Sequence, residues 1–168
     1  MTSSKKGIET MKPIIDSTST EEPVVVMTRV FDVSREVVWE ALTTPEHVAR
    51  WFGGHGFSSP VCEMDLRPGG IWRHVMRAPD GSEFPVNSVF VEIVEPERLV
   101  WKSHRKVSAT EISEVTHTVT LESLEGKTRW KLVARFATFA DRDISVRMGF
   151  AQIVGQGVER LGGFLENR

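Results

Sequence analysis

Apolar and polar residues alternate along much of the second half of the chain, as expected of strands that bury one face of a sheet. The alternation is clearest in residues 115–121 (VTHTVTL) and 130–136 (WKLVARF). Four similar runs lie between residues 61 and 105, separated by turn signals such as Pro68-Gly69-Gly70. Residues 23–33 (PVVVMTRVFDV) are apolar and β-branched. The pattern therefore predicts a first strand and a later meander of about six more.

Helical signals occur twice, directly after the first predicted strand and at the end of the chain. Ser34 is placed to cap a helix over residues 35–43, and Thr44 followed by Pro45 reads as the start of a second helix that ends before Gly53-Gly54. Asp141 or Asp143 would cap a long helix reaching nearly to Arg168. Its apolar stripe, spaced three or four residues apart, consists of Ile144, Met148, Ala151, Val154, Val158, Leu161 and Leu165.

The predicted last helix is unusually rich in glycine. Each glycine inside a helix costs roughly 1 kcal/mol relative to alanine. Two explanations remain open: the helix frays or ends early, or the small residues leave room for a ligand beneath it. The glycines concerned are Gly149, Gly155, Gly157, Gly162 and Gly163.

Composition narrows the classes of protein to consider. The 168 residues carry a formal net charge of −2, so no positive field favours nucleic acid as a partner. A single cysteine, Cys62, excludes an internal disulfide and suits a reducing compartment. Residues 1–22 are rich in Ser, Thr and charge and are predicted to be a flexible tail. We find no signal peptide and no apolar run long enough for membrane insertion, and we expect a cytoplasmic protein with one domain over residues 23–168.

Several short motifs together identify a family. They are residues 34–39 (SREVVW), 44–46 (TPE), 50–53 (RWFG), 64–70 (MDLRPGG), 80–81 (DG) and 95–100 (EPERLV). With these motifs the chain resembles, from about residue 24 to 166, the activator of heat-shock protein 90 ATPase homologue-like branch of the START-like (SRPBCC) superfamily. The resemblance implies an α+β helix-grip fold. In that fold a curved antiparallel sheet of about seven strands wraps around a long C-terminal helix, with two short helices after strand one.

The chain departs from this family in the last helix. Members commonly carry Gly-Trp shortly before a Leu-Asp-Arg-Leu-type segment, where this chain has Ile153-Val154 before Val158. With Val154 in the position of the indole, the cavity is either larger or filled by Trp72 or Phe150. The ligand of a relative therefore does not carry over to this chain.

Standard catalytic and phosphate-binding motifs are absent from the sequence. His74 alternates in phase with Trp72 and Met76, and His117 lies on the apolar face of its strand, so both are predicted to point inward. Each is either a core histidine bonded to the backbone or water, or a polar contact or general acid or base for a ligand. The spacing of the histidines does not require a metal triad. We predict no metal site and no cofactor, and we expect Cys62 to be a buried, inert thiol.

Aromatic residues give the stronger indication of a site. The chain has five tryptophans and nine phenylalanines but no tyrosine. Within the resembled fold, several of them would border the space between the sheet and the last helix, where a small-ligand site is usually apolar with a few polar groups. The predicted ligand-binding residues are Trp51, Phe52, Trp72, His74, Met76, Trp101, His117, Trp130, Met148 and Val154.

Three functions are compatible with this sequence. The first is binding of a small hydrophobic, lipid-like or amphipathic molecule in the cavity between the sheet and the C-terminal helix. The second is a cyclase or dehydratase-like enzyme acting on a polyketide or aromatic substrate, for which no paired acid and orienting group is identified. The third, implied by the family alone, is a chaperone-associated protein that activates the ATPase of heat-shock protein 90. Some relatives form homodimers, and the sequence leaves the oligomeric state open.

Overall fold

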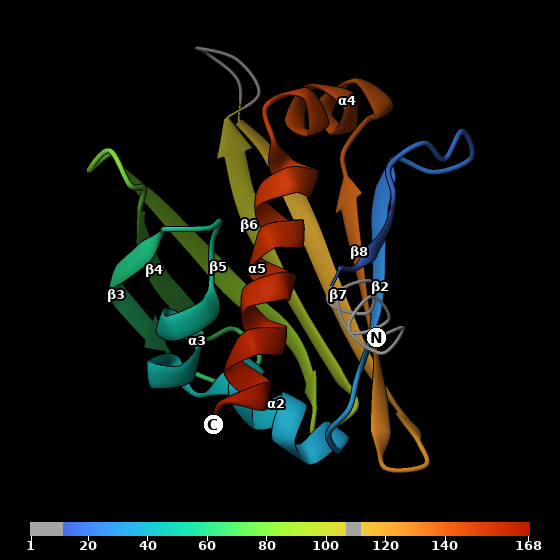
Figure 1. Ribbon diagram of the computed structural model, residues 1–168. Coiled ribbons are helices and arrows are strands. Elements are labelled where there is room, and N and C mark those ends of the chain that lie inside the picture. Colours follow the sequence, from blue (N-terminus) through green and yellow to red (C-terminus); the bar gives the residue numbers. More distant parts are fainter. Residues whose placement is uncertain (1–11, 107–111) are drawn as a thin grey trace, which may run out of the picture.

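The computed structural model describes residues 12–106 and 112–168 and contains one curved antiparallel sheet (Figure 1). The eight strands lie in the order β1-β2-β8-β7-β6-β5-β4-β3, and every neighbouring pair is antiparallel. The α+β helix-grip architecture predicted from the sequence is confirmed. The strands are β1 (Ile14–Asp16), β2 (Val24–Phe31), β3 (Ser58–Met64), β4 (Ile71–Arg77), β5 (Glu83–Val94), β6 (Arg98–Lys106), β7 (Ile112–Leu124) and β8 (Lys127–Phe136).

Strand β1 is the one strand that the sequence pattern did not predict. It lies inside the segment predicted to be a flexible tail, and it pairs with β2 through Ile14 opposite Thr28 and Asp16 opposite Val26. A run of three residues is too short to show alternation, and its neighbours Ser17 to Ser19 resemble a loop. The sheet therefore has eight strands rather than about seven.

The two short helices occur where the local signals placed them. Helix α2 (Arg35–Thr43) begins after Ser34, and α3 (Pro45–Trp51) begins after Thr44 with proline in its first turn. Neither capping side chain forms a hydrogen bond to the helix, so the fixed φ of Pro45 and the extended backbone of Thr44 define the boundary. Together α2 and α3 cover one end of the concave face of the sheet (Figure 1).

The long last helix predicted from the sequence is in fact two helices. Helix α4 (Phe139–Arg147) is capped by Thr138, whose side chain accepts a hydrogen bond from the Asp141 backbone N–H. Gly149 then adopts a left-handed conformation with φ 97°, and α5 (Phe150–Glu166) begins directly after it. The prediction of one continuous helix from Asp141 or Asp143 was wrong, because the apolar spacing continues across a glycine that ends the helix.

Helix α5 crosses the concave face of the sheet (Figure 1), and its glycines lie where other parts of the chain approach it closely. A Cβ on Gly155 would lie 3.1 Å from Ile15, and one on Gly157 would lie 3.3 Å from the Gly53 carbonyl oxygen. A Cβ on Gly162 would overlap the guanidinium of Arg29. The explanation that the helix frays is wrong, since α5 continues to Glu166. At these three positions, the space beside the glycine is occupied by other residues of the chain and leaves no room for a ligand.

Arg29 is a charged residue inside this contact. It is 8% exposed, its Nη1 donates to the Val158 carbonyl at 2.9 Å, and its guanidinium lies 4.6 Å from the centre of the Phe31 ring. Burial lowers the pKa of Arg29 from its ordinary value. The group thus joins β2 to α5 through a backbone carbonyl rather than through a buried carboxylate.

Substitution of two adjacent glycines of α5 tests whether the close approach of Arg29 requires a glycine at position 162. Gly162→Ala gains helix propensity but pushes against the buried Arg29 guanidinium, so we expect the free energy of unfolding to fall by about 1–3 kcal/mol. Gly163→Ala, which meets no heavy atom within 4 Å, should raise it by about 0.5–1 kcal/mol. Urea unfolding of both variants measures the difference, and equal effects of the two substitutions would contradict a role for the Arg29 contact.

Candidate functional site

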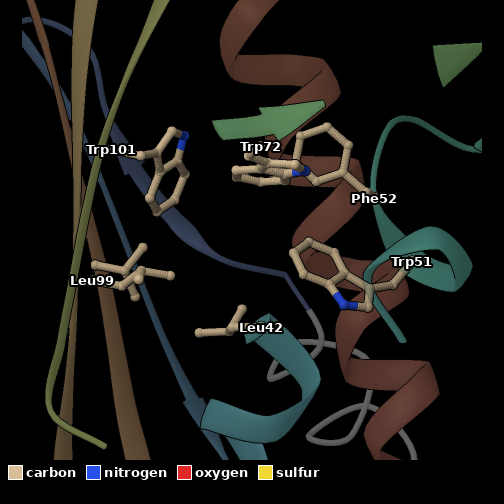
Figure 2. Close-up of a pocket in the computed structure, with 7 residues that line it drawn as sticks. Leu42, Trp51, Phe52, Trp72, Leu99 and Trp101 are labelled. Carbon is tan, nitrogen blue, oxygen red and sulfur yellow. The ribbon is translucent and has the colours of Figure 1, made fainter. Parts of the chain in front are cut away.

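A small internal cavity lies between helices α2 and α3 and the concave face of the sheet (Figure 2). Its volume is about 30 Å³, room for one or two water molecules by size. The lining side chains come from α2, the end of α3, β4, β6 and β7, and none comes from α5. The lining residues are Leu42, Trp51, Phe52, Trp72, Leu99, Trp101 and Val119.

The end of helix α3 delivers two of the rings that close the cavity. Trp51 is the last residue of α3, and its indole Nε1 donates to the Ala41 carbonyl of α2 at 2.9 Å. That bond fixes the indole against α2. Phe52 follows in extended conformation and turns its ring toward the sheet, where it faces Trp72 and His74. The Phe52 ring has no polar atom and is held by packing alone.

Trp72 on β4 is the centre of the aromatic cluster. Its ring meets Phe52 edge-on at 5.4 Å and Trp101 edge-on at 5.5 Å, and it stacks on Phe90 at 6.0 Å with an interplanar angle of 5°. Edge-to-face and offset-stacked contacts are the favoured arrangements of aromatic rings. Trp72 is 5% exposed, so the cluster forms part of the hydrophobic core as well as one wall of the cavity.

His74 is fixed in one neutral form by its neighbours. It is 1% exposed, its Nδ1 lies 3.2 Å from the Trp72 indole Nε1, and its Nε2 lies 2.8 Å from the Ser59 hydroxyl. Because an indole N–H only donates, Nδ1 must accept, and the ring proton therefore resides on Nε2, which donates to Ser59. Burial lowers the pKa of His74 to about 4. At neutral pH this histidine is uncharged, and both of its ring nitrogens have partners.

His117 on β7 also points into the concave side of the sheet, but beyond the lining residues. It is 9% exposed, its ring stacks on Trp101 at 5.0 Å with an interplanar angle of 12°, and its Nε2 lies 2.9 Å from the Ser103 hydroxyl. Phe150 at the start of α5 lies 6.2 Å away, ring centre to ring centre. His117 thus supports the outer side of the Trp101 ring.

The other reactive side chains lie apart from the cavity. Cys62 on β3 is half-buried, and desolvation raises the pKa of its thiol to about 11, so the thiolate is scarce at neutral pH. His104 is exposed and pairs with Glu114 at 3.9 Å. Among the residues that the structure describes, no three His, Cys, Asp or Glu side chains gather as metal ligands would.

The structure brings together four of the ten residues predicted to bind a ligand, namely Trp51, Phe52, Trp72 and Trp101. Of the others, Met76 is half-buried near Gly53 and Trp130 is buried in the core on β8. Met148 is 59% exposed at the corner between α4 and α5, and Val154 packs on the core without reaching the cavity. His74 and His117 flank the rings without lining the space.

Three lining residues were missed: Leu42, Leu99 and Val119. A signal for two of them was present, because Leu99 shares a face with Trp101, and Val119 shares one with His117. Strand pairing places Leu99 directly opposite Val119. Aliphatic residues look like ordinary core in a sequence, so only the position of α2 and α3 shows that they border a space.

The sequence of this chain was compared with known protein families, and one family matches it. Residues 32–166 match the family described as Activator of Hsp90 ATPase homolog 1-like protein. The chain belongs to this family. The resemblance inferred from the short motifs is thereby confirmed. No protein in a comparison with curated proteins matches the chain.

Several solved structures share the fold of this chain. A Nitrosomonas europaea protein is 28% identical, with 89% of this chain and 97% of that chain covered and a TM-score of 0.77. An Arthrobacter aurescens protein is 21% identical over 92% of each chain, with a TM-score of 0.83. A Rhodobacter sphaeroides protein is 22% identical over 94% of this chain and all of that chain, with a TM-score of 0.81. For the Arthrobacter and Rhodobacter proteins, the similarity shows a shared fold and nothing more.

None of the helices in the described part of the chain has both the length and the hydropathy needed to cross a bilayer. The 17 residues of α5, the longest helix, are amphipathic and pack against α2, α3, α4 and β2. The apolar face of α5 is thus covered by the protein itself.

The neutral state of His74 predicts a particular pH dependence of stability. The folded pKa of about 4 lies below the ordinary value of 6.5, so the unfolded chain binds a proton first as the pH falls. His74 should therefore stabilise the fold fully above about pH 6.5 and lose up to about 3 kcal/mol of that effect between pH 6.5 and 4. Urea unfolding at several pH values should show a flatter profile for His74→Gln than for the wild type. His104→Gln, at an exposed histidine, serves as the control for the substitution itself.

Proposed function

We propose that this protein binds a small, neutral hydrophobic ligand among the rings of Trp51, Phe52, Trp72 and Trp101. The observation that carries the proposal is the internal cavity itself, whose lining is wholly aromatic and aliphatic. Proteins of this fold family commonly bind hydrophobic ligands. The site lies against α2 and α3 rather than against the C-terminal helix, where the sequence had suggested it.

The chemistry of the lining favours a hydrophobic ligand over an amphipathic one. No charged side chain borders the cavity, and the indole N–H of Trp51 and that of Trp72 already donate to Ala41 and His74. A ligand with a charged or strongly polar group would lose its hydration without gaining a partner. Planar aromatic compounds fit best, because edge-on and stacked contacts are available from rings on two sides.

Binding requires the cavity to grow, since about 30 Å³ holds no organic molecule. Phe52 is the side chain best suited to move, because it is half-buried and makes no hydrogen bond through its ring. Trp51 and Trp72 are held by hydrogen bonds as well as by packing. We therefore place the expansion at Phe52.

For the enzymatic alternative, His74 lacks the properties that a general base needs. A general base near neutral pH has a pKa near 7 and a free lone pair that faces the substrate. Burial lowers the pKa of His74 to about 4, and its one lone-pair nitrogen accepts from Trp72. His74 is therefore unsuited as a general base, and ligand binding is the function that the lining of the cavity supports best.

Cavity volume gives a direct test with naphthalene as the probe. Val119→Ile adds one methylene to the cavity and should weaken naphthalene binding about tenfold or more, whereas Leu99→Ala enlarges the cavity and should strengthen it. Leu121→Ala is the matched control, because Leu121 is similarly buried but does not line this cavity. Isothermal titration and the shift in melting temperature measure binding. Naphthalene binding that is absent in the wild type, or equal in all four proteins, would contradict the proposed site.

A further inference from the structure

The segment that follows α3, residues 52–57, covers the cavity from one side and is attached to α5 largely by polar contacts. Two of its glycines have left-handed backbone conformations, Gly53 with φ 95° and Gly56 with φ 80°. On its inner side the Phe52 ring packs on the Trp72 ring (Figure 2). It also packs on the His74 ring. Its outer side faces helix α5. We refer to residues 52–57 as the covering segment.

Arg160 of α5 is the main attachment. Its Nη1 donates to the carbonyls of Phe52 at 3.0 Å, Gly53 at 3.3 Å and Gly54 at 3.1 Å, and its Nη2 donates to the Arg50 carbonyl at 3.0 Å. A cation at this place also interacts favourably with the carbonyl end of helix α3. One side chain thus satisfies four carbonyls where α3 ends and the covering segment begins.

Three further residues of α5 complete the attachment. Gly157 lets the Gly53 backbone approach, the side-chain oxygen of Gln156 accepts from the His55 backbone N–H at 3.0 Å, and Glu159 pairs with the His55 ring at 3.0 Å. The His55 ring is 58% exposed, so this pair adds little compared with the carbonyl contacts of the half-buried Arg160.

An apolar path leads from beneath the covering segment to the surface. Trp72, His74 and Met76 share the concave face of β4, and Met76 stands directly opposite Phe84 of β5. Phe84 is 47% exposed, and its ring stacks on Phe57 at 6.5 Å. A row of apolar and aromatic surfaces therefore runs from the cavity wall to solvent.

The covering segment closes this path over its whole length. The Phe52 ring lies 4.5 Å from the His74 ring, and a Cβ built on Gly53 would lie 3.3 Å from the Met76 sulfur. At the outer end of the path, Phe57 covers Phe84. Displacement of residues 52–57 would remove all three of these contacts between the cavity and Phe84.

We propose that the covering segment is the gate through which a hydrophobic ligand reaches the cavity, and that Arg160 is the positioning residue that holds this gate shut. The proposal rests on the proposed ligand-binding function and adds to it a route and a closing contact. The gate opens when the covering segment separates from α5 and takes the Phe52 ring with it. Residues on both sides of Gly53 then move while α3 remains attached to α2 through the Trp51 indole.

Hydrogen exchange tests the gate without any ligand. In Arg160→Met, which keeps the aliphatic stem but removes the donors, we expect the amides of residues 52–57 to exchange about tenfold faster than in the wild type. Gln156→Ala is a milder second variant and should accelerate the same amides about threefold. Unchanged exchange in both variants, or acceleration spread evenly over α5 and the sheet, would overturn the proposal.

Arg142 of α4 provides a matched control. Like Arg160, it donates to backbone carbonyls, those of Ser19 at 2.6 Å and Glu22 at 3.4 Å. Arg142 is buried rather than half-buried, and it lies away from the covering segment. Arg142→Met should accelerate exchange around residues 19–24 and leave residues 52–57 unchanged. An equal effect of Arg142→Met on residues 52–57 would show that the amides report global stability instead of a gate.

Stopped-flow mixing with naphthalene, followed by tryptophan fluorescence, tests the route of the ligand. Arg160→Met should raise the association and dissociation rates together by about tenfold and change Kd by less than about twofold, because the closed pocket is unaltered. A changed Kd with an unchanged association rate would mean that Arg160 shapes the pocket and would overturn the gate. Failure of naphthalene to bind either protein would contradict the proposed function, and the exchange result alone would then decide whether Arg160 holds the segment closed.

Discussion

The rest of the structure depends on how closely helix α5 lies against the other parts of the chain. At Gly155, Gly157 and Gly162 the helix has no side chain, and Ile15, the Gly53 backbone and Arg29 occupy the space instead. These contacts join α5 to β1, to the segment after α3 and to β2. The position of that segment in turn sets where Phe52 lies, and hence the size of the cavity. The lower helix propensity of glycine is thus offset by tertiary contacts that a larger residue would prevent.

Several polar groups of the interior find their partners within the protein itself. Arg29 and Arg160 both donate to main-chain carbonyls, and His74 uses both ring nitrogens within the protein. Buried polar groups with partners cost little, whereas unpaired ones are expensive. The interior therefore offers a ligand apolar surface and ring faces, and little hydrogen bonding. The proposed binding would therefore depend on shape and on the movement of one side chain.

Local signals predicted a large part of this fold, and non-local geometry accounts for the rest. Helices α2 and α3 follow from Ser34 and Thr44-Pro45, and β7 and β8 follow from alternation, because these signals depend on adjacent residues. The break at Gly149 was missed, since the apolar spacing continues through it. The alternating pattern correctly predicted that Trp72 and Trp101 point inward. It did not predict which end of the sheet α2 and α3 cover. Trp130 and Met148 were therefore included among the ligand-binding residues although neither lines the cavity, and Leu42 was overlooked.

The aromatic cluster also bears on how such a protein could change over evolutionary time. The size of the interior space is set by a few ring side chains on separate elements, while the backbone around them is held by strand pairing and by the α5 contacts. Among these rings, Phe52 alone has neither an indole N–H nor another polar atom, so a smaller residue there would create volume without breaking a hydrogen bond. Under the proposed ligand-binding function, one inherited substitution at this codon would let the protein accept bulkier molecules and leave its architecture intact. Diversity of ligands on a constant scaffold would then require few mutations.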